Sequence, residues 1–259
     1  MTQKVGIAGT GAIGKAVAKA LLEGIDGLEL GAISDLRQNL DIGVPYVDFD
    51  VLTESCDLIV ECLPPQAVPA LTQATFARNK DLTLISSCAL LMFPNILENH
   101  KQSTSRIYVP SGALTGMDGI KALKELGIKR SKIVSTKPPK GLLGAPHVEK
   151  MGIDLMQIRR KERLFAGNAL EAAKGFPANA NVAATLSLAG IGPEQTDVEV
   201  WADPEAFGNT HEVTVEGEFS TIRVQVTNTP DPANPKSSML AAQSIVATLR
   251  DINNSLVVL

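Results

Sequence analysis

Three glycines near the start of the chain constrain its fold more than any other feature. Gly9, Gly11 and Gly14 occur in G-x-G-x-x-G spacing. The segment before them, residues 4–8, is apolar enough for a buried strand, and the segment after them, residues 12–22, has the periodicity of a helix. In this strand–turn–helix context the spacing is typical of a dinucleotide-binding unit, whereas in isolation it would indicate little more than a tight turn.

Each glycine of this loop has a physical task. Gly9 permits the tight turn, Gly11 lets a pyrophosphate approach the backbone, and Gly14 lets the helix pack closely on the strand. The N-terminus of the helix then offers N–H groups and a partial positive charge to the phosphates. The predicted cofactor contacts of the loop are Gly9, Gly11, Ala12, Ile13 and Gly14.

An acidic residue follows the second apolar segment, residues 28–34. Asp35 lies about 20 residues after the glycine loop, where a carboxylate accepts hydrogen bonds from the adenosine ribose hydroxyls of NAD. Arg37 is close enough to accommodate the 2′-phosphate of NADP instead. The predicted cofactor is therefore NAD or NADP, and both Asp35 and Arg37 are expected to contact it.

The hydrophobic pattern differs between the first and second parts of the chain. The first part alternates short apolar segments with helical ones, which predicts β-α units around a parallel sheet. Further strands are expected there at residues 57–63, 82–87 and 107–109, with a helix at 69–78. After Gly116 the segments alternate polar and apolar residues, which favours an open antiparallel sheet with one covered face. Its strands are expected at 133–137, 197–203, 211–216 and 220–227, and its covering helices at 164–174 and 182–189.

These patterns predict an α/β fold with a Rossmann-type dinucleotide-binding domain and a smaller α+β open-sheet domain. The first domain is expected to comprise residues 1–113 and 234–259, and the second residues 114–233. Asn234 and Pro235 suit the N-cap and first position of a terminal helix that runs to about residue 251 and returns to the first domain.

Composition excludes several classes of function. The net charge is −4, from 24 basic and 28 acidic residues, and no basic run is present, which argues against nucleic acid as a partner. No apolar stretch reaches the roughly 20 residues of a membrane helix. The three cysteines lack metal-ligand spacing, so we expect no metal site and a reduced, cytoplasmic environment. Aromatic residues make up only 4% of the chain, too few for base-stacking platforms.

The chain has three histidines, and one of them is a candidate general base. His211 begins an alternating strand on the same face as Val213 and Val215, where an imidazole is partly desolvated yet able to reach a ligand. A histidine that is merely hydrogen-bonded within the sheet is the alternative. His100 is expected on the solvated surface, and the loop position of His147 indicates no role.

A block at residues 175–190, which includes Phe176-Pro177-Ala178-Asn179-Ala180-Asn181, resembles the signature of the L-aspartate dehydrogenase family. The resemblance extends in order through residues 110–113, 137–140, 203–212 and 234–239, and so spans nearly the whole chain. Residues 62–64 and 87–89, at the ends of two expected strands, depart from the family pattern.

The resemblance implies a site and an activity. His211 matches the catalytic histidine of the family, and Ala113 and Asn181 match positions that contact NAD. The implied reaction is reversible NAD(P)-dependent oxidative deamination of L-aspartate to iminoaspartate, and then to oxaloacetate and ammonia, which serves NAD biosynthesis or aspartate metabolism. The family also implies a homodimer, with the second domain catalytic and dimer-forming. From the residues alone, Asn181 could instead cap a helix that begins at Val182.

A dicarboxylate substrate requires cations or N–H and O–H donors at both ends. The candidates in the second half of the chain are Lys137, Lys140, Lys236, Ser237 and Ser238. Two other functions remain open: a reductase or dehydrogenase of the dihydrodipicolinate reductase or homoserine dehydrogenase-like type, and a non-catalytic NAD-binding sensor. The block at residues 175–190 and the position of His211 argue against the first, and the second would need no positioned base.

Overall fold

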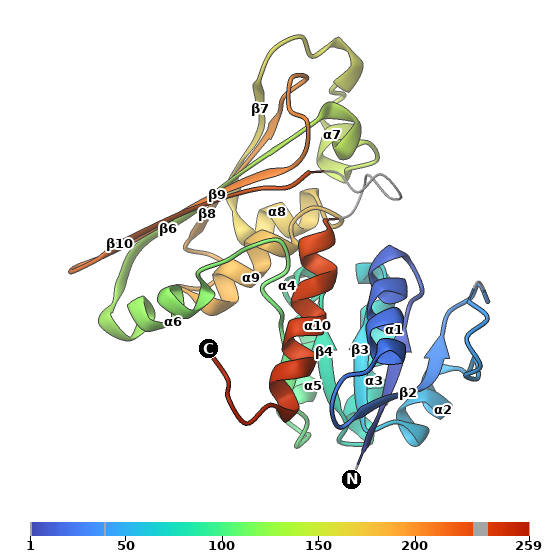
Figure 1. Cartoon of the computed structure of the whole chain (residues 1–259). Coiled ribbons are helices and arrows are strands. Elements are labelled where there is room, and N and C mark those ends of the chain that lie inside the picture. Colours follow the sequence, from blue (N-terminus) through green and yellow to red (C-terminus); the bar gives the residue numbers. More distant parts are fainter. Residues whose placement is uncertain (1, 39, 230–237, 259) are drawn as a thin grey trace. The chain divides into compact units, whose positions relative to one another are not determined.

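The computed structural model describes residues 2–38, 40–229 and 238–258, and it divides the chain into two compact units (Figure 1). Unit 1 comprises Met1–Gly112 and Met239–Leu259, and unit 2 comprises Ala113–Ser238. The predicted terminal-helix start at Asn234 and Pro235 lies outside the described residues.

Unit 1 contains a five-stranded parallel sheet, as the alternating pattern predicted. The strand order is β2-β1-β3-β4-β5. The strands are β1 (Gln3–Ala8), β2 (Leu28–Ser34), β3 (Leu58–Glu61), β4 (Asp81–Leu84) and β5 (Ile107–Tyr108). β3 and β4 are shorter than predicted, because the apolar residues after Glu61 and Leu84 belong to the connections at the carboxyl edge of the sheet.

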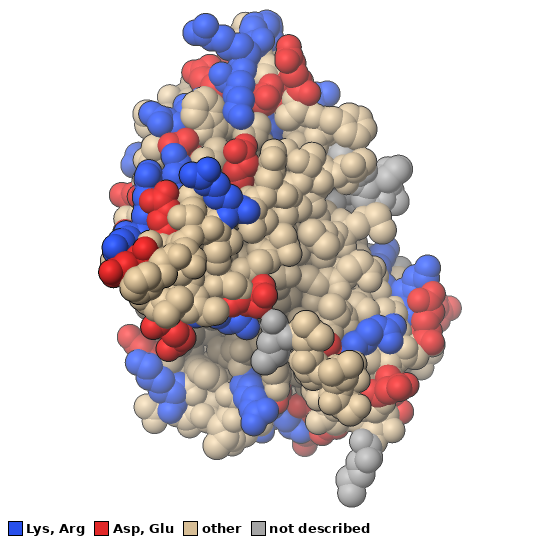
Figure 2. Space-filling view, turned by 60° about the vertical axis from the view of Figure 1, so that its left-hand side comes forward, with Lys and Arg blue, Asp and Glu red and all other residues tan. Residues whose placement is uncertain are grey.

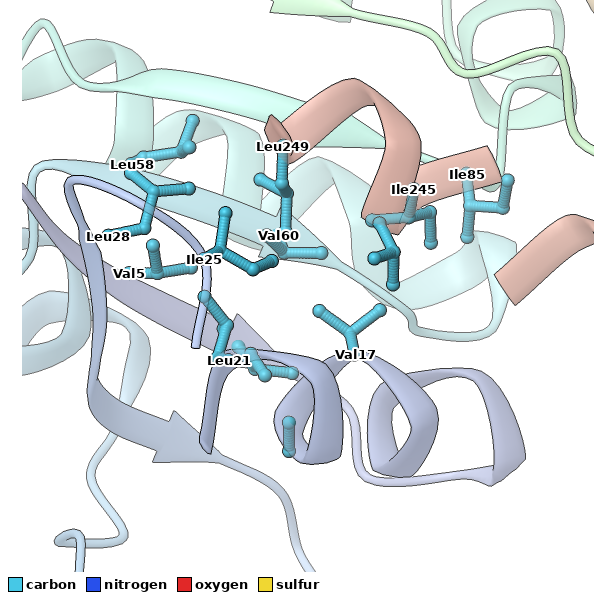
Figure 3. Packing of buried hydrophobic residues seen from close by; sticks show 13 residues of the cluster. Val5, Val17, Leu21, Ile25, Leu28, Leu58, Val60, Ile85, Ile245 and Leu249 are labelled. Carbon is cyan, nitrogen blue, oxygen red and sulfur yellow. The ribbon is translucent and has the colours of Figure 1, made fainter. Parts of the chain in front are cut away.

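Seven helical segments accompany this sheet among the described residues of unit 1. They are α1 (Ala12–Glu23), α2 (Phe49–Ser55), η1 (Pro65–Ala67), α3 (Val68–Ala77), α4 (Cys88–Met92), α5 (Asn95–His100) and α10 (Met239–Asn253). α10 packs beside α1, although some 220 residues separate them in the chain (Figure 1). Ile245 and Leu249 of α10 point into one apolar cluster with Val17 and Leu21 of α1 and Val60 of β3 (Figure 3). The last helix therefore completes the core of the first unit.

Unit 2 contains a second five-stranded sheet, with the order β10-β9-β6-β8-β7. Its strands are β6 (Ile128–Lys137), β7 (Glu162–Asn168), β8 (Thr196–Ala202), β9 (Thr210–Gly217) and β10 (Thr221–Thr227). The prediction of a purely antiparallel sheet is wrong for one pair, because β6 and β8 are parallel. Between these two strands the chain passes through β7 and three α-helices, and this long crossover lets β8 run in the same direction as β6.

The prediction of a helix at residues 164–174 is also wrong for the first half of that range. Residues up to Asn168 form the edge strand β7, and the helix α8 (Ala169–Gly175) begins only after it. Asn168 caps α8 through a capping box, in which its side chain accepts from the Glu171 N–H and Glu171 accepts from the Asn168 N–H. This cap fixes the start of the helix and leaves the preceding residues to pair with β8.

Helices α6 (Met117–Leu126), α8 and α9 (Asn181–Ala189) lie along one side of the second sheet (Figure 1). The short elements η2 (Pro139–Leu142), α7 (Pro146–Lys150) and η3 (Leu155–Gln157) connect β6 to β7. The opposite face of the sheet carries ion pairs, including Lys132–Glu199 with 2.9 Å between Nζ and Oε1. In Figure 2 the cationic and anionic side chains of the visible face are intermixed rather than gathered by sign. None of the described helices is long and apolar enough to cross a membrane.

We expect Leu249→Ala to lower the free energy of unfolding by about 2 to 5 kcal/mol, because it leaves a cavity in a fully buried cluster. Leu240→Ala, on the same helix but 43% exposed, is the matched control and should change it by only about 0.5 kcal/mol. Urea unfolding of both variants measures the difference. Equal effects of the two substitutions would show that α10 does not complete the core.

Candidate functional site

The glycine loop of unit 1 leaves space for a ligand at one glycine and no space at the other two. Gly9 has φ +95° and its N–H donates to the Ser34 carbonyl at 2.8 Å. A Cβ on Gly14 would collide with the carbonyl oxygen of Gly9, and a Cβ on Gly9 would collide with that of Cys62. A Cβ on Gly11 would meet nothing within 4 Å. Gly9 and Gly14 are thus needed for the fold of the loop, and Gly11 borders open space that a pyrophosphate can enter.

The N-terminus of α1 follows this open space. Gly11 is the N-cap and has no side chain with which to cap the helix, and the first turn contains no acidic residue. Ala12 and Ile13 begin the helix and are half-buried. A phosphate here would meet backbone N–H groups and the positive end of the helix dipole, which is the fit that the sequence predicted.

Asp35 lies directly after β2, and its carboxylate is held in one orientation. Its Oδ2 accepts from the Thr10 N–H at 2.6 Å and from the Thr10 hydroxyl at 2.7 Å, while Oδ1 accepts from the Arg37 N–H at 2.8 Å. Burial opposes ionisation, but these hydrogen bonds outweigh it and lower the pKa of Asp35. The Arg37 guanidinium is 78% exposed and only 4.0 Å from the carboxylate. Asp35 is therefore an anion held in one orientation beside the glycine loop.

Glu61 is a buried acid that the sequence analysis did not single out. It ends β3, and its two oxygens accept from the Leu63 N–H at 2.5 Å and the Ser86 N–H at 2.9 Å. It thereby links the connections that follow β3 and β4, and burial raises its pKa to about 7. The only signal in the sequence was an acidic residue at the end of an otherwise apolar strand.

Unit 2 contains a pocket of about 480 Å³. It is lined by Lys137, Pro138, Lys140, Gly141, Leu143, Ala178, Asn179, Phe207, Gly208, Asn209, Asn228, Thr229 and Ser238. Three of the predicted substrate contacts, Lys137, Lys140 and Ser238, are thus brought together. Lys236 and Ser237 lie outside the described residues. Two lysines together with three asparagine amides make a pocket suited to an anionic ligand that also needs hydrogen-bond donors.

Lys137 is the buried cation of this pocket. It ends β6, is 7% exposed, and donates from Nζ to the Asn179 Oδ1 at 2.6 Å. Burial lowers its pKa to about 8. Lys137 therefore still carries its charge at neutral pH, but in a site where the charge is poorly solvated and attracts an anion strongly. Lys140, at the same pocket, is exposed.

His211 lies beside Lys137 on the covered face of the sheet. It pairs with Ser135 in the β6–β9 register, its Nδ1 is 2.9 Å from the Ser135 Oγ, and it is 3% exposed. Burial, followed by the charge of Lys137, lowers its pKa to about 3. His211 is thus buried more completely than the sequence suggested. It is hydrogen-bonded within the sheet, as the alternative interpretation held, and it is also next to the pocket.

The other predicted positions in unit 2 lie outside the pocket lining. Asn181 is the first residue of α9 and Ala180 is the N-cap, so the interpretation of Asn181 as the cap is wrong. Ala113 is buried. His147 packs its ring against Phe165 and Phe176, which indicates a structural role. Within the described residues no group of three His, Cys, Asp or Glu side chains is placed to hold a metal ion.

The sequence analysis missed three polar side chains around Lys137 and His211 as site residues. Ser135 could have been found from strand alternation, because it is two residues before Lys137 on the same face. Asn179 and Asn209 both lie in segments of the family resemblance, but nothing in those segments indicated that they line a pocket. Their role depends on the loops after α8 and β8, which sequence patterns do not position.

Comparison with known proteins identifies both parts of the chain. A family model described as aspartate dehydrogenase, C-terminal, matches residues 118–252, and one described as homoserine dehydrogenase, NAD binding domain, matches residues 9–110. An L-aspartate dehydrogenase of Methanosarcina acetivorans is 41% identical over 97% of both chains. L-aspartate dehydrogenase 3 of Bordetella bronchiseptica is 39% identical over 96% of this chain and 94% of its own. The chain belongs to the L-aspartate dehydrogenase family.

Solved structures agree with this membership. The crystal structure of aspartate dehydrogenase from Thermotoga maritima matches with a TM-score of 0.78 and 27% identity over 100% of both chains. A scyllo-inositol dehydrogenase from Lactobacillus casei matches with a TM-score of 0.54 at 15% identity, over 96% of this chain and 87% of its own, and shares only the fold. As a member of the L-aspartate dehydrogenase family, the chain is an NAD(P)-dependent oxidoreductase.

We expect Asp35→Ser to lower the ratio of kcat/KM with NAD⁺ to kcat/KM with NADP⁺ by at least about tenfold. The fixed carboxylate favours the ribose hydroxyls and repels a 2′-phosphate, and the substitution leaves Arg37 free to bind that phosphate. Steady-state kinetics with both cofactors measures the ratio. Asp41→Ser, an exposed acidic residue nearby in the chain, is the control, and an unchanged ratio in Asp35→Ser would contradict the assignment.

Proposed function

We propose that this chain oxidises L-aspartate with NAD(P)⁺ to iminoaspartate, which is hydrolysed to oxaloacetate and ammonia, and that the reaction is reversible. Its family supports the activity. The single structural observation that carries the proposal is the buried pair of Lys137 and His211 on one sheet face, with Lys137 opening into a polar pocket. This arrangement supplies one cation for a carboxylate and one neutral imidazole for a proton.

The pocket suits a small dicarboxylate. Lys137 is the buried cation and is assigned to one carboxylate, because an ammonium with few water contacts gains most from an anionic partner. Lys140 and the side chain of Ser238 are assigned to the other carboxylate. Ser238 already donates to the Asn228 Oδ1 at 2.6 Å, so it is oriented by its neighbour before a ligand binds.

His211 is assigned to proton transfer. The substrate ammonium must lose a proton before the nitrogen lone pair can assist departure of hydride from Cα, and a neutral imidazole accepts that proton. Because Nδ1 is hydrogen-bonded to the Ser135 hydroxyl, Nε2 is the nitrogen assigned to accept this proton. The imidazolium releases this first proton to solvent. The neutral imidazole then takes a proton from the water that adds to the imine and gives it to the departing ammonia.

The cofactor, when bound, supplies the hydride acceptor. The chain holds it through the glycine loop, the N-terminus of α1 and Asp35. Ala113 and Asn181 are assigned as further NAD contacts from the family resemblance. Neither contributes an acid or a base, so their part is to position the nicotinamide.

The test of the activity is aspartate-dependent formation of reduced cofactor, measured by absorbance with a panel of amino acids and with NAD⁺ and NADP⁺ in parallel. We expect a response to L-aspartate and a fall in kcat/KM of about 100-fold or more in His211→Asn, with cofactor affinity retained. His100→Gln is the control, since His100 lies in unit 1, where its Nε2 is 2.7 Å from the Ser105 carbonyl and its ring packs against Phe76. Turnover of other amino acids but not of aspartate, or near-normal activity in His211→Asn, would refute the assignment.

We further propose that the chain forms a homodimer through the face of the second sheet opposite to α8 and α9. On this face Thr214, in the second strand from the β10 edge, lies between Lys132 and Arg223. The support for a dimer is the family resemblance, and in a two-fold dimer the same face of both copies would meet.

Light scattering should give the wild-type protein twice the mass of a single chain. Thr214→Glu should yield a monomer, because it adds a desolvated carboxylate to the interface, whereas the cationic neighbours Lys132 and Arg223 accommodate it in the folded monomer. Lys121→Glu, on the exposed side of α6, serves as the control. A monomeric wild type, or a Thr214→Glu variant that remains dimeric, would exclude this interface.

A further inference from the structure

His211 is poorly suited to its proposed task while the pocket contains no anion. A general base works best when its pKa lies near the working pH. Burial and the neighbouring Lys137 instead keep the pKa of His211 at about 3, so that its imidazole binds protons too weakly. Burial is the larger of these two causes, so the part of the shift that a bound substrate is able to remove is the part that a neighbouring charge produces.

The geometry of the sheet shows which group carries that charge. Ser135 is directly opposite His211 in the β6–β9 pair, and Lys137 lies two residues further along β6 on the same face. Such diagonal neighbours are about 7 to 8 Å apart at Cα, within the reach of a long side chain. Both side chains are buried, so little water screens the ammonium from the imidazole. Protonation of His211 would place a second buried cation beside the first.

Other charges around His211 do not compensate for that of Lys137. On its second neighbour β10 the paired residue is Val226, and α9 contains no ionisable residue. The charged residues of the covering helices α6 and α8 are Asp118, Lys121, Lys124, Glu125, Glu171 and Lys174. Glu212, next in sequence to His211, belongs to the opposite face of the strand. Lys137 is the charged group whose field acts on His211.

We propose that Lys137 is an electrostatic switch for His211: a substrate carboxylate that binds Lys137 cancels its charge and so raises the proton affinity of His211. This rests on the assignment of the pocket to a dicarboxylate and goes beyond it, because it couples substrate recognition to proton transfer. The proton moves from the substrate ammonium to His211, so the total charge of the site does not change, and the imidazolium forms beside a Lys137 whose charge the carboxylate has already cancelled. An amino acid without a carboxylate in reach of Lys137 leaves the proton affinity of His211 low, so the switch also contributes to specificity.

Asn179 holds the Lys137 ammonium in its position. Its Oδ1 accepts from the Lys137 Nζ and supplies a partial negative charge without neutralising the ammonium. The charge of Lys137 is therefore oriented toward the pocket and remains available for a carboxylate. A full negative charge at residue 179 would imitate the bound substrate.

The test is an NMR titration of the full-length protein with isotope-labelled histidine, with and without succinate, an unreactive four-carbon dicarboxylate. The chain has only three histidines, so His100→Gln and His147→Gln assign the signals. Saturating succinate should raise the titration midpoint of His211 by at least about one pH unit, a tenfold gain in proton affinity. Calorimetry in parallel verifies that succinate binds.

Three variants test whether the rise of the His211 midpoint depends on the charge of Lys137 or on a structural change. Lys137→Met should raise the His211 midpoint in the absence of ligand and abolish most of the further rise with succinate. Asn179→Asp, nearly isosteric, should raise the midpoint without ligand and weaken succinate binding at least about tenfold. Lys140→Met removes an exposed lysine from the same pocket and should leave the ligand-free midpoint of His211 unchanged.

The possible outcomes distinguish this inference from the proposed function. Bound succinate with an unmoved His211 midpoint, or the same rise in Lys137→Met as in the wild type, would overturn the switch even if aspartate is turned over normally. Absence of succinate binding would overturn both the pocket assignment and the switch. A succinate-induced rise that depends on Lys137, in a protein without aspartate turnover, would support the switch and refute only the proposed substrate.

Discussion

β6 is hydrogen-bonded along both edges, to β8 in parallel and to β9 in antiparallel orientation, and the chemistry of unit 2 depends on this central position. The pairing with β9 sets Ser135 opposite His211, and the two-residue period of the strand puts Lys137 on the same face. A shift of one residue in register would turn Lys137 to the other face and separate it from the imidazole. The register of one strand pair thus determines whether the Lys137 ammonium and the His211 imidazole lie together.

The two units use different physics to bind charge. In unit 1, the loop at Gly9 to Gly14 offers backbone N–H groups and a helix N-terminus, while Asp35 is fixed by hydrogen bonds from its own neighbours. In unit 2, Lys137 and His211 are removed from water, and the charge of Lys137 adds to burial in lowering the pKa of His211. Neither arrangement needs an aromatic surface, which is consistent with an aromatic content of only 4%.

Sequence patterns predicted the parts of the fold in which local and global preferences agree. The glycine loop, the strand at residues 28–34 and the helix of residues 182–189 all appear close to their expected positions. The pattern failed at residues 164–168, where apolar spacing compatible with a helix belongs to an edge strand, because the cap at Asn168 and pairing with β8 outweigh helix propensity. It also failed for the direction of β8. The alternation of polar and apolar residues indicates that one face of a strand is covered, but not whether the neighbouring strand is parallel or antiparallel.

The sequence by itself determined the candidates for cofactor binding and proton transfer, since the glycine spacing, Asp35, and the segment that contains His211 are recognisable from residue type and order. Only the tertiary structure decided how these residues behave. Burial and register, which depend on contacts between segments far apart in the chain, make Lys137 a cation with a lowered pKa and His211 an imidazole under its influence. The proton affinity of a side chain is a property of its surroundings, and those surroundings exist only after the sheet has formed.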